Sequence, residues 1–75
     1  MYILRADGKL IVNTNQIDAI CVYKRSDGFG IMAYRGSEES GLGTYEDEGA
    51  AMAVMFRIYD ALGRGKQMLD LGNRA

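Results

Sequence analysis

Two Asp-Gly dipeptides lie between apolar runs in the first half of this chain, and they limit how that half can fold. The runs YILR, KLIVN, QIDAICVYK and GIMAYR are rich in Ile, Val and Tyr, which favour β-strands. Asp-Gly between such runs favours a hairpin, because both central residues of a type I′ turn need a positive φ. We therefore expect two β-hairpins, one turning at Asp7 and Gly8 and one turning near Asp27 and Gly28.

These turn positions also predict how the strands pair. The expected opposite pairs are Leu4 with Ile11, Ile3 with Val12, Tyr23 with Met32, and Val22 with Ala33. A tight connection, NTNQ, joins the two hairpins, and a loop, GSEESG, leads to LGTY, which we expect to be a fifth strand beside the fourth. Because every connection is short and antiparallel, the sequence predicts a meander sheet.

The hydrophobic period changes after residue 46, from that of strands to that of a helix. Apolar residues recur there at spacings of three and four, which places them on one stripe of a helix. These residues are Ala51, Val54, Met55, Ile58 and Leu62. Asp47 or Glu46 can cap the start of this helix, and Gly63 is positioned to end it in a left-handed turn. The tail KQMLDLG then returns as a short edge strand or docks loosely.

The patterns together predict an α+β fold in a single domain, residues 1–75. An antiparallel meander of about five strands packs against one C-terminal helix, with a possible short final strand. A domain of this size gains only about 3–5 kcal/mol from its own core. Cys21 is the single cysteine and there is no histidine, so neither an internal disulfide nor the usual zinc site can add stability. Oligomerisation remains as the source of further stability.

The predicted helix carries a second apolar stripe, which supports oligomerisation. Met52, Phe56 and Tyr59 are spaced i, i+4 and i+7, turned away from the first stripe. The sheet repeats this feature: if Ile20, Val22, Ile31 and Ala33 face the helix, alternation sends four other residues to the opposite face. Those four are Cys21, Tyr23, Met32 and Tyr34. We expect all seven residues to form self-association contacts; the alternative is that solvent covers them, since scattered surface apolar residues are normal.

Catalytic signals are weak throughout the sequence. Cys21 has no histidine to act as its base, and we interpret it as a small hydrophobic residue on a strand. The acidic residues at 38–39 and 46–48 fit a polar loop and a helix start. The glycines in DGFG, GLGT and GRGK fit turns and caps and do not form a phosphate loop. We therefore expect no enzyme activity, no cofactor and no metal; a ligand or enzymatic site built in an oligomeric cleft is a weaker alternative.

The charge balance disfavours a polyanionic partner. Nine Lys and Arg against ten Asp and Glu leave a formal charge of −1. The strongest rival function is still nucleic-acid binding, through a small basic and aromatic face. Its residues would be Lys24, Arg25, Arg64, Lys66, Phe29, Tyr23 and Tyr34.

The short apolar run at the N-terminus and the lack of any run near 20 apolar residues predict a cytoplasmic protein with no membrane contact.

The order of motifs resembles that of small uncharacterised proteins of Gram-positive bacteria and their phages. DGKLIVN is followed by IDAI, a DG hairpin, LGTY, a helix that opens with acidic residues and alanine, and a strand-like end. The matching positions are Ile11, Val12, Asn13, Ile17, Ile20, Leu42, Gly43, Tyr45, Ala51, Val54, Met55 and Ile58. The chain departs from that pattern at Gly49, Ala50, Met52 and Phe56, where charged residues are expected. The resemblance implies an α+β fold and no catalytic residues. We therefore predict a non-enzymatic, self-associating accessory protein, with a nucleic-acid-binding regulator as the alternative.

Overall fold

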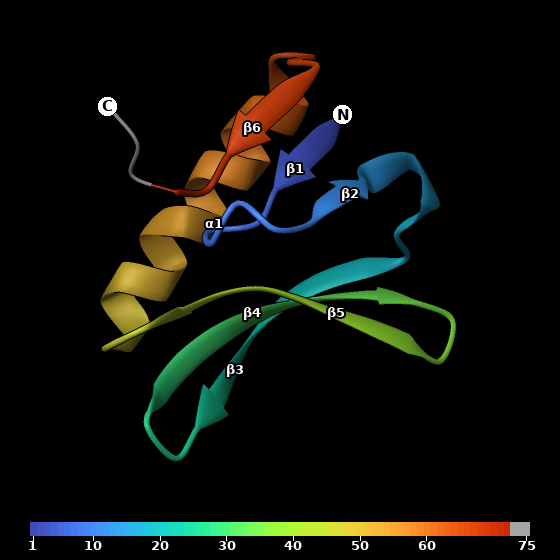
Figure 1. Cartoon of the computed structure of the whole chain (residues 1–75). Helices are drawn as coiled ribbons and strands as arrows, with labels where there is room; N and C mark the ends of the chain where they lie inside the picture. Colours follow the sequence, from blue (N-terminus) through green and yellow to red (C-terminus); the bar gives the residue numbers. More distant parts are fainter. Residues whose placement is uncertain (73–75) are drawn as a thin grey trace.

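The computed structural model describes residues 1–72, which form two small β-sheets and one α-helix (Figure 1). The elements in chain order are β1 (Tyr2–Leu4), β2 (Ile11–Asn13), the 3₁₀ turn η1 (Thr14–Gln16), β3 (Ala19–Arg25), β4 (Gly28–Arg35), β5 (Glu38–Tyr45), α1 (Glu48–Gly63) and β6 (Met68–Asp70). Sheet A has the strand order β2-β1-β6, and sheet B has the order β3-β4-β5. The predicted α+β class and the C-terminal helix are confirmed.

The predicted single sheet of about five strands is wrong, because β2 does not pair with β3 in the structure. The antiparallel meander is confirmed only within sheet B, where β3, β4 and β5 follow one another. Between the sheets, the side chain of Asn13 accepts a hydrogen bond from the Asn15 N–H (3.0 Å), and the Ile17 N–H donates to the Thr14 carbonyl (3.2 Å). These bonds close η1, which redirects the chain before β3 begins.

The C-terminal segment returns as a strand, β6, which pairs in parallel with β1. Tyr2 lies opposite Met68, and Ile3 lies opposite Leu69. A parallel pair needs a long crossover between its strands, and here the crossover includes the whole of sheet B and α1. The predicted edge strand is therefore present, but its partner is the first strand of the chain.

The first hairpin has the predicted register, with Leu4 opposite Ile11. Its turn is longer than predicted. The Arg5 N–H donates to the Leu10 carbonyl (2.8 Å), which leaves a four-residue loop, and within it only Gly8 has a positive φ, of 75°. The turn is therefore not of type I′, because that type needs two consecutive residues with positive φ.

The second hairpin turns one residue earlier than predicted, at Ser26 and Asp27, and this shifts the partner of each β3 residue by two positions. The predicted pairs of Tyr23 with Met32 and Val22 with Ala33 are consequently wrong, and the observed pairs are Tyr23 with Gly30, Val22 with Ile31 and Cys21 with Met32. Gly28, with a φ of 144°, begins β4 and packs so closely on the Tyr45 carbonyl that a Cβ would clash. A shift of two residues keeps every side chain on its predicted face.

Strand β5 begins at Glu38, so most of the segment predicted to be a loop, GSEESG, is strand. Only Gly36 and Ser37 connect β4 to β5, and the φ of Gly36 is 59°, as the first central residue of a type II′ turn requires. The register shifts between Ile31 and Met32, which leaves Leu42 as the extra residue of a β-bulge.

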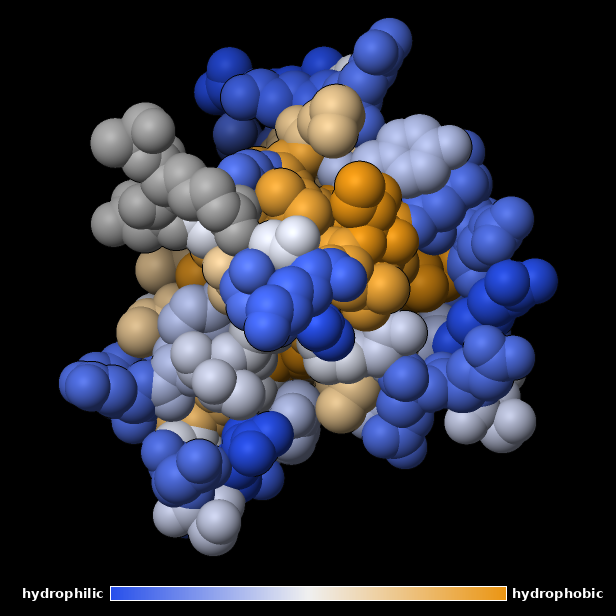
Figure 2. Space-filling view, in the orientation of Figure 1, coloured by the Kyte–Doolittle hydropathy of each residue, from blue (hydrophilic) through white to orange (hydrophobic). Residues whose placement is uncertain are grey.

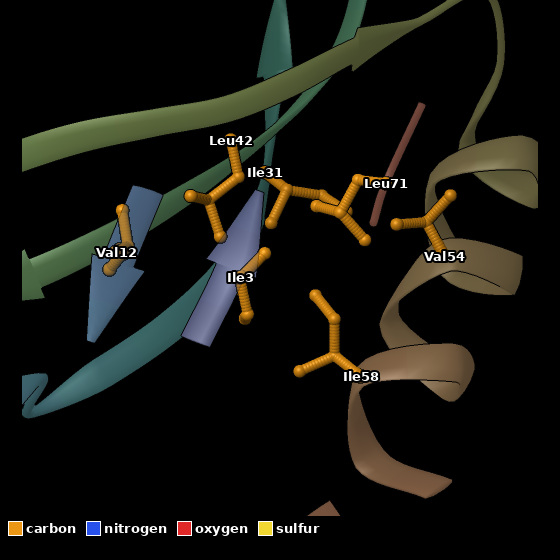
Figure 3. Close-up of a cluster of buried hydrophobic side chains, with 8 residues drawn as sticks. Ile3, Val12, Ile31, Leu42, Val54, Ile58 and Leu71 are labelled. Atoms are coloured by element: carbon orange, nitrogen blue, oxygen red, sulfur yellow. The ribbon is translucent and has the colours of Figure 1, made fainter. Parts of the chain in front are cut away.

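The core lies where the two sheets and the helix meet (Figure 3). It contains residues from β1, β2, β4, β5, α1 and the segment after β6, namely Ile3, Val12, Ile31, Ala33, Leu42, Val54, Ile58 and Leu71. Ala61 is buried on the inner side of α1, whereas Leu62, which was predicted to be buried, is 48% exposed. The stripe that packs on the core is therefore centred closer to Val54 than the sequence spacing suggested.

Both ends of α1 are capped. The Asp47 carboxylate accepts a hydrogen bond from the Ala50 N–H (2.8 Å), so Asp47 is the N-cap, and Glu46 is not. The predicted left-handed residue at the end is Gly65, with a φ of 68°, and not Gly63. Lys66 N–H donates to the carbonyl of Ala61 (3.0 Å), which is the long bond of a Schellman motif. Arg64 keeps a helical conformation, which moves the left-handed residue two positions along the chain.

Candidate self-association surface

The second apolar stripe of α1 is exposed, as the sequence predicted. Met52 is 42% exposed, Phe56 66% and Tyr59 75%. Together with the half-buried Met55 they line a shallow hollow of about 220 Å³. This stripe therefore leaves three large apolar side chains of α1 exposed.

A second hollow continues this stripe toward sheet B. It has a volume of about 300 Å³ and lies between α1 and the start of β3. Met55 and Tyr59 line both hollows, and Ile17 and Ile20 line the second one from the other side. The apolar stripe is thus continuous with a groove that runs to the first residues of β3.

The opposite flank of the helix is already occupied. Arg57 Nη2 donates a hydrogen bond to the Asp70 carbonyl (2.9 Å), which ties that flank to β6. The flank that carries Tyr59 and Leu62 instead lines the groove beside β3. The open side of the helix is consequently the side next to β3.

Strand β3 forms one edge of sheet B. It pairs with β4 on one side, and the strand order places no strand of residues 1–72 on its other side. An edge strand leaves alternate backbone N–H and C=O groups without a sheet partner. We use the term helix–β3 surface for this edge and the neighbouring apolar side chains, defined as Ala19–Arg25 with Met52, Met55, Phe56, Tyr59 and Leu62.

The four predicted sheet residues share the other face of sheet B. Cys21 lies directly opposite Met32, and alternation puts Tyr23 and Tyr34 on the same face. All four are only partly exposed, so this face is less accessible to solvent than expected. One reason is that the Tyr23 ring covers Gly30, which has no side chain of its own. The structure therefore does not bring the seven predicted residues into one surface: Met52, Phe56 and Tyr59 lie on the helix side of sheet B.

A further apolar surface was missed by the sequence reasoning. Tyr2, Ile11 and Met68 are exposed on the face of sheet A that points away from the core. Figure 2 shows this face as an orange area over β1 and β2. The predicted pair of Leu4 with Ile11 contained the signal, since Ile3 and Val12 must then face the opposite way. Met68 could not be placed there without knowing that β6 lies beside β1.

The basic residues predicted for nucleic-acid binding are partly neutralised by acidic neighbours. Arg25 Nε lies 3.1 Å from Asp27 Oδ1, and Arg64 Nε lies 3.0 Å from Asp60 Oδ1. The hydrogen bond from Arg25 holds the pKa of Asp27 below its ordinary value. Arg25 also donates to the Tyr23 hydroxyl (3.3 Å), and this bond is the main reason that the pKa of Arg25 is raised. The hairpin tip thus carries a compensated ion pair.

A hollow of about 500 Å³ lies where the first hairpin loop meets sheet B. Two arginines, Arg5 and Arg25, line it together with Tyr23 and Thr44. Arg5 Nε lies 2.8 Å from Asp7 Oδ1, and the hydrogen bond from Arg5 lowers the pKa of Asp7. Each arginine therefore already has a carboxylate partner.

The features that catalysis would need are sparse in residues 1–72. No group of three or more Cys, Asp and Glu side chains gathers there as a metal site requires. Cys21 contacts the Tyr34 hydroxyl, and the hydrogen bond between the two side chains is the main cause that raises the pKa of Tyr34. In the same part of the chain, no helix is both long and apolar enough to cross a bilayer.

Comparison of the chain with protein-family models, with curated proteins and with solved structures found no match.

Proposed function

We propose that this protein acts by binding protein chains, in the first place copies of itself, and that it is a small accessory protein without catalytic activity. The observation that carries the proposal is the helix–β3 surface, where an exposed apolar helix stripe continues into a groove beside an unpaired strand edge. Contiguous exposed apolar surface of this kind is typical of interaction sites. The resemblance to small proteins of Gram-positive bacteria and their phages suggests a bacterial or phage setting for this role.

The energetics support association. Burying a side chain the size of Phe56 contributes about 1.5–3 kcal/mol. A symmetric dimer buries each such residue twice, so Phe56, Tyr59 and Met52 can together offset association costs of about 4–15 kcal/mol. The core cluster has only eight residues, and a chain this short gains little stability from its own core. The free energy gained by association is therefore a large addition to its stability.

Substitution of Phe56 by Glu tests the proposal. Light scattering at micromolar concentration should report more than one chain per particle for the wild type. Phe56→Glu should shift the mass toward the monomer and weaken association by at least tenfold, because it places a charge in an apolar contact. The matched control is Ala53→Glu, which adds the same charge at an exposed position of the same helix.

Two results would contradict the proposal. A wild type that stays monomeric at micromolar concentration would show that solvent covers the helix–β3 surface. Equal behaviour of Phe56→Glu and Ala53→Glu would show that the apolar stripe is not the contact.

Nucleic-acid binding is a second candidate, favoured by one observation. The hollow lined by Arg5, Arg25 and Tyr23 combines guanidinium groups with an aromatic ring, as single-strand binding requires. It ranks second because Asp7 and Asp27 already pair with the two arginines.

A further inference from the structure

The two edges of sheet B differ in how well they are protected. At β5, the bulge at Leu42 interrupts the ladder, and the Leu42 carbonyl accepts a hydrogen bond from the Ala6 N–H (3.0 Å). Strand β3 has seven residues without Gly or Pro, no register shift against β4, and no strand of residues 1–72 on its outer side. Bulges, prolines and covering segments are the usual devices that prevent edge pairing, so β3 is the edge suited to take another strand.

We infer that β3 pairs antiparallel with β3 of a second copy, with Cys21 on the twofold axis. This inference rests on the proposed self-association and names its geometry. The two copies of sheet B then form one continuous six-stranded sheet. Both α1 helices lie on the same face of it, because a twofold axis perpendicular to a sheet keeps each face on its own side.

Symmetry allows few registers. Opposite residues must point to the same face, so their numbers must both be even or both odd, and one residue lies opposite itself. The central candidates are Ile20, Cys21 and Val22. With Val22 at the centre, Lys24 lies opposite Ile20 of the second copy. With Ile20 at the centre, Asp18 lies opposite Val22. Each of these registers places a charge against an apolar side chain.

The register centred on Cys21 places no charge opposite an apolar side chain. Ile20 lies opposite Val22 of the second copy, and Ala19 lies opposite Tyr23. Asp18, the residue before β3, whose Oδ2 accepts a hydrogen bond from the Gly36 N–H (2.7 Å), comes opposite Lys24, so one attractive charge pair lies at each end of the paired segment. Cross-strand pairs of opposite charge, or of aliphatic residues, stabilise a sheet, whereas mismatched pairs do not. Charge complementarity therefore selects this register.

The same arrangement accounts for the exposed helix stripe. The groove between β3 and α1 is lined by Ile20, Met55 and Tyr59, and it lies on the side of the helix that faces the axis. Pairing of the two β3 strands brings the same groove of the second copy to the other side of the axis. The apolar flanks of the two helices then face each other across the extended sheet, which buries Tyr59 and its neighbours.

Oxidation of the wild-type protein tests the register directly. Directly opposed residues in antiparallel strands have Cα atoms about 4.5–5.5 Å apart, which is within the range of a disulfide. Two Cys21 thiols and one molecule of oxidised glutathione give one Cys21–Cys21 disulfide and two molecules of reduced glutathione. We expect a covalent dimer to become the main species on non-reducing electrophoresis, and Phe56→Glu to abolish it.

A moved cysteine provides the control. In the double variant Cys21→Ala, Val22→Cys, the new thiols lie opposite Ile20 and not opposite each other, so little covalent dimer should form. The charge pair has its own test: Lys24→Asp should raise the dimer Kd about tenfold, whereas Lys66→Asp, which makes the same charge change beyond the helix, should change it less than twofold.

The outcomes separate this inference from the proposed function. If light scattering shows an oligomer but Cys21 does not cross-link, or the cysteine at position 22 cross-links instead, the register is wrong and self-association stands. Equal effects of Lys24→Asp and Lys66→Asp likewise contradict the register. If the wild type is monomeric, the proposed function fails and this inference fails with it.

Discussion

The hydroxyl group of Tyr45 is buried, and no residue within 1–72 gives it a hydrogen bond. The ring packs against the core and lies over Gly43, which has no side chain to displace it. Burial raises the pKa of this hydroxyl above its ordinary value, and the nearby Arg57 opposes the shift only in part. A buried polar group without a partner lowers stability, so this residue is a place where the fold can be improved.

Tyr45→Phe should raise the free energy of unfolding by about 1 kcal/mol at pH 7, because it removes the unpaired hydroxyl. The raised pKa adds a pH dependence. The folded state binds the Tyr45 proton more tightly than the unfolded state does. The stabilisation of the folded state that results is fully present below about pH 10 and is lost as the pH rises through the folded pKa. In urea unfolding between pH 7 and 11, the free energy of unfolding should fall more steeply with rising pH for the wild type than for Tyr45→Phe. The exposed Tyr2, changed to Phe, is the control. Lower stability of Tyr45→Phe at pH 7 would mean that the hydroxyl has a stabilising partner.

At the scale of the element, α1 depends on one capping side chain. Asp47 accepts a hydrogen bond from the Ala50 N–H, and Glu48 adds negative charge in the first turn, where the helix dipole favours it. The helix has 16 residues, and its buried side chains supply much of the core. Loss of the cap should therefore lower the stability of the whole domain.

Asp47→Ala should lower the free energy of unfolding by about 0.5–2 kcal/mol, since the Ala50 N–H loses its acceptor. Glu46→Ala removes the same charge one residue earlier, outside the cap, and should have a smaller effect. Thermal and urea unfolding at one fixed protein concentration measure both variants, because association also shifts stability. Equal losses for the two variants would show that the charge matters and the capping hydrogen bond does not.

At the scale of the whole molecule, the large exposed apolar side chains of residues 1–72 occupy two regions. The helix–β3 surface is one, and the outer face of sheet A, with Tyr2, Ile11 and Met68, is the other. Another hollow, of about 590 Å³, is lined by Tyr2, Met68 and Leu62, so the two regions approach each other near the end of α1. The positive charges that would recruit a polyanion are, in contrast, few and partly paired with carboxylates.

The charge distribution predicts weak binding of nucleic acid. With a formal charge of −1 and with Arg5 and Arg25 already paired, we expect no affinity beyond the non-specific range of roughly 10⁻⁴–10⁻⁶ M at physiological salt. Fluorescence anisotropy with labelled single- and double-stranded oligonucleotides measures this. A tight, salt-dependent complex that is lost on changing Lys24 and Arg25 to Ala would place nucleic-acid binding ahead of self-association.

Local patterns in the sequence were enough for several parts of the fold. The pairing of Leu4 with Ile11, the helix with an acidic N-cap at Asp47 or Glu46, and the exposure of Met52, Phe56 and Tyr59 all follow from residues a few positions apart. Alternation also placed Cys21 and Met32 on one face, and that assignment is correct although the predicted pairing register was wrong by two residues. Such features depend on backbone geometry that repeats every two or every 3.6 residues.

Contacts between distant residues decided the rest. Nothing near Met68 indicates that it lies opposite Tyr2, and no local pattern separates β2 from β3 into different sheets. The position of the helix on the core, not its periodicity, buries Ala61 and exposes Leu62. The apolar groove beside β3 likewise exists only because the helix and the strand edge are brought together. The chain's sequence thus determined its elements and their faces, whereas the tertiary structure determined which faces are covered, because burial depends on what the rest of the chain can reach.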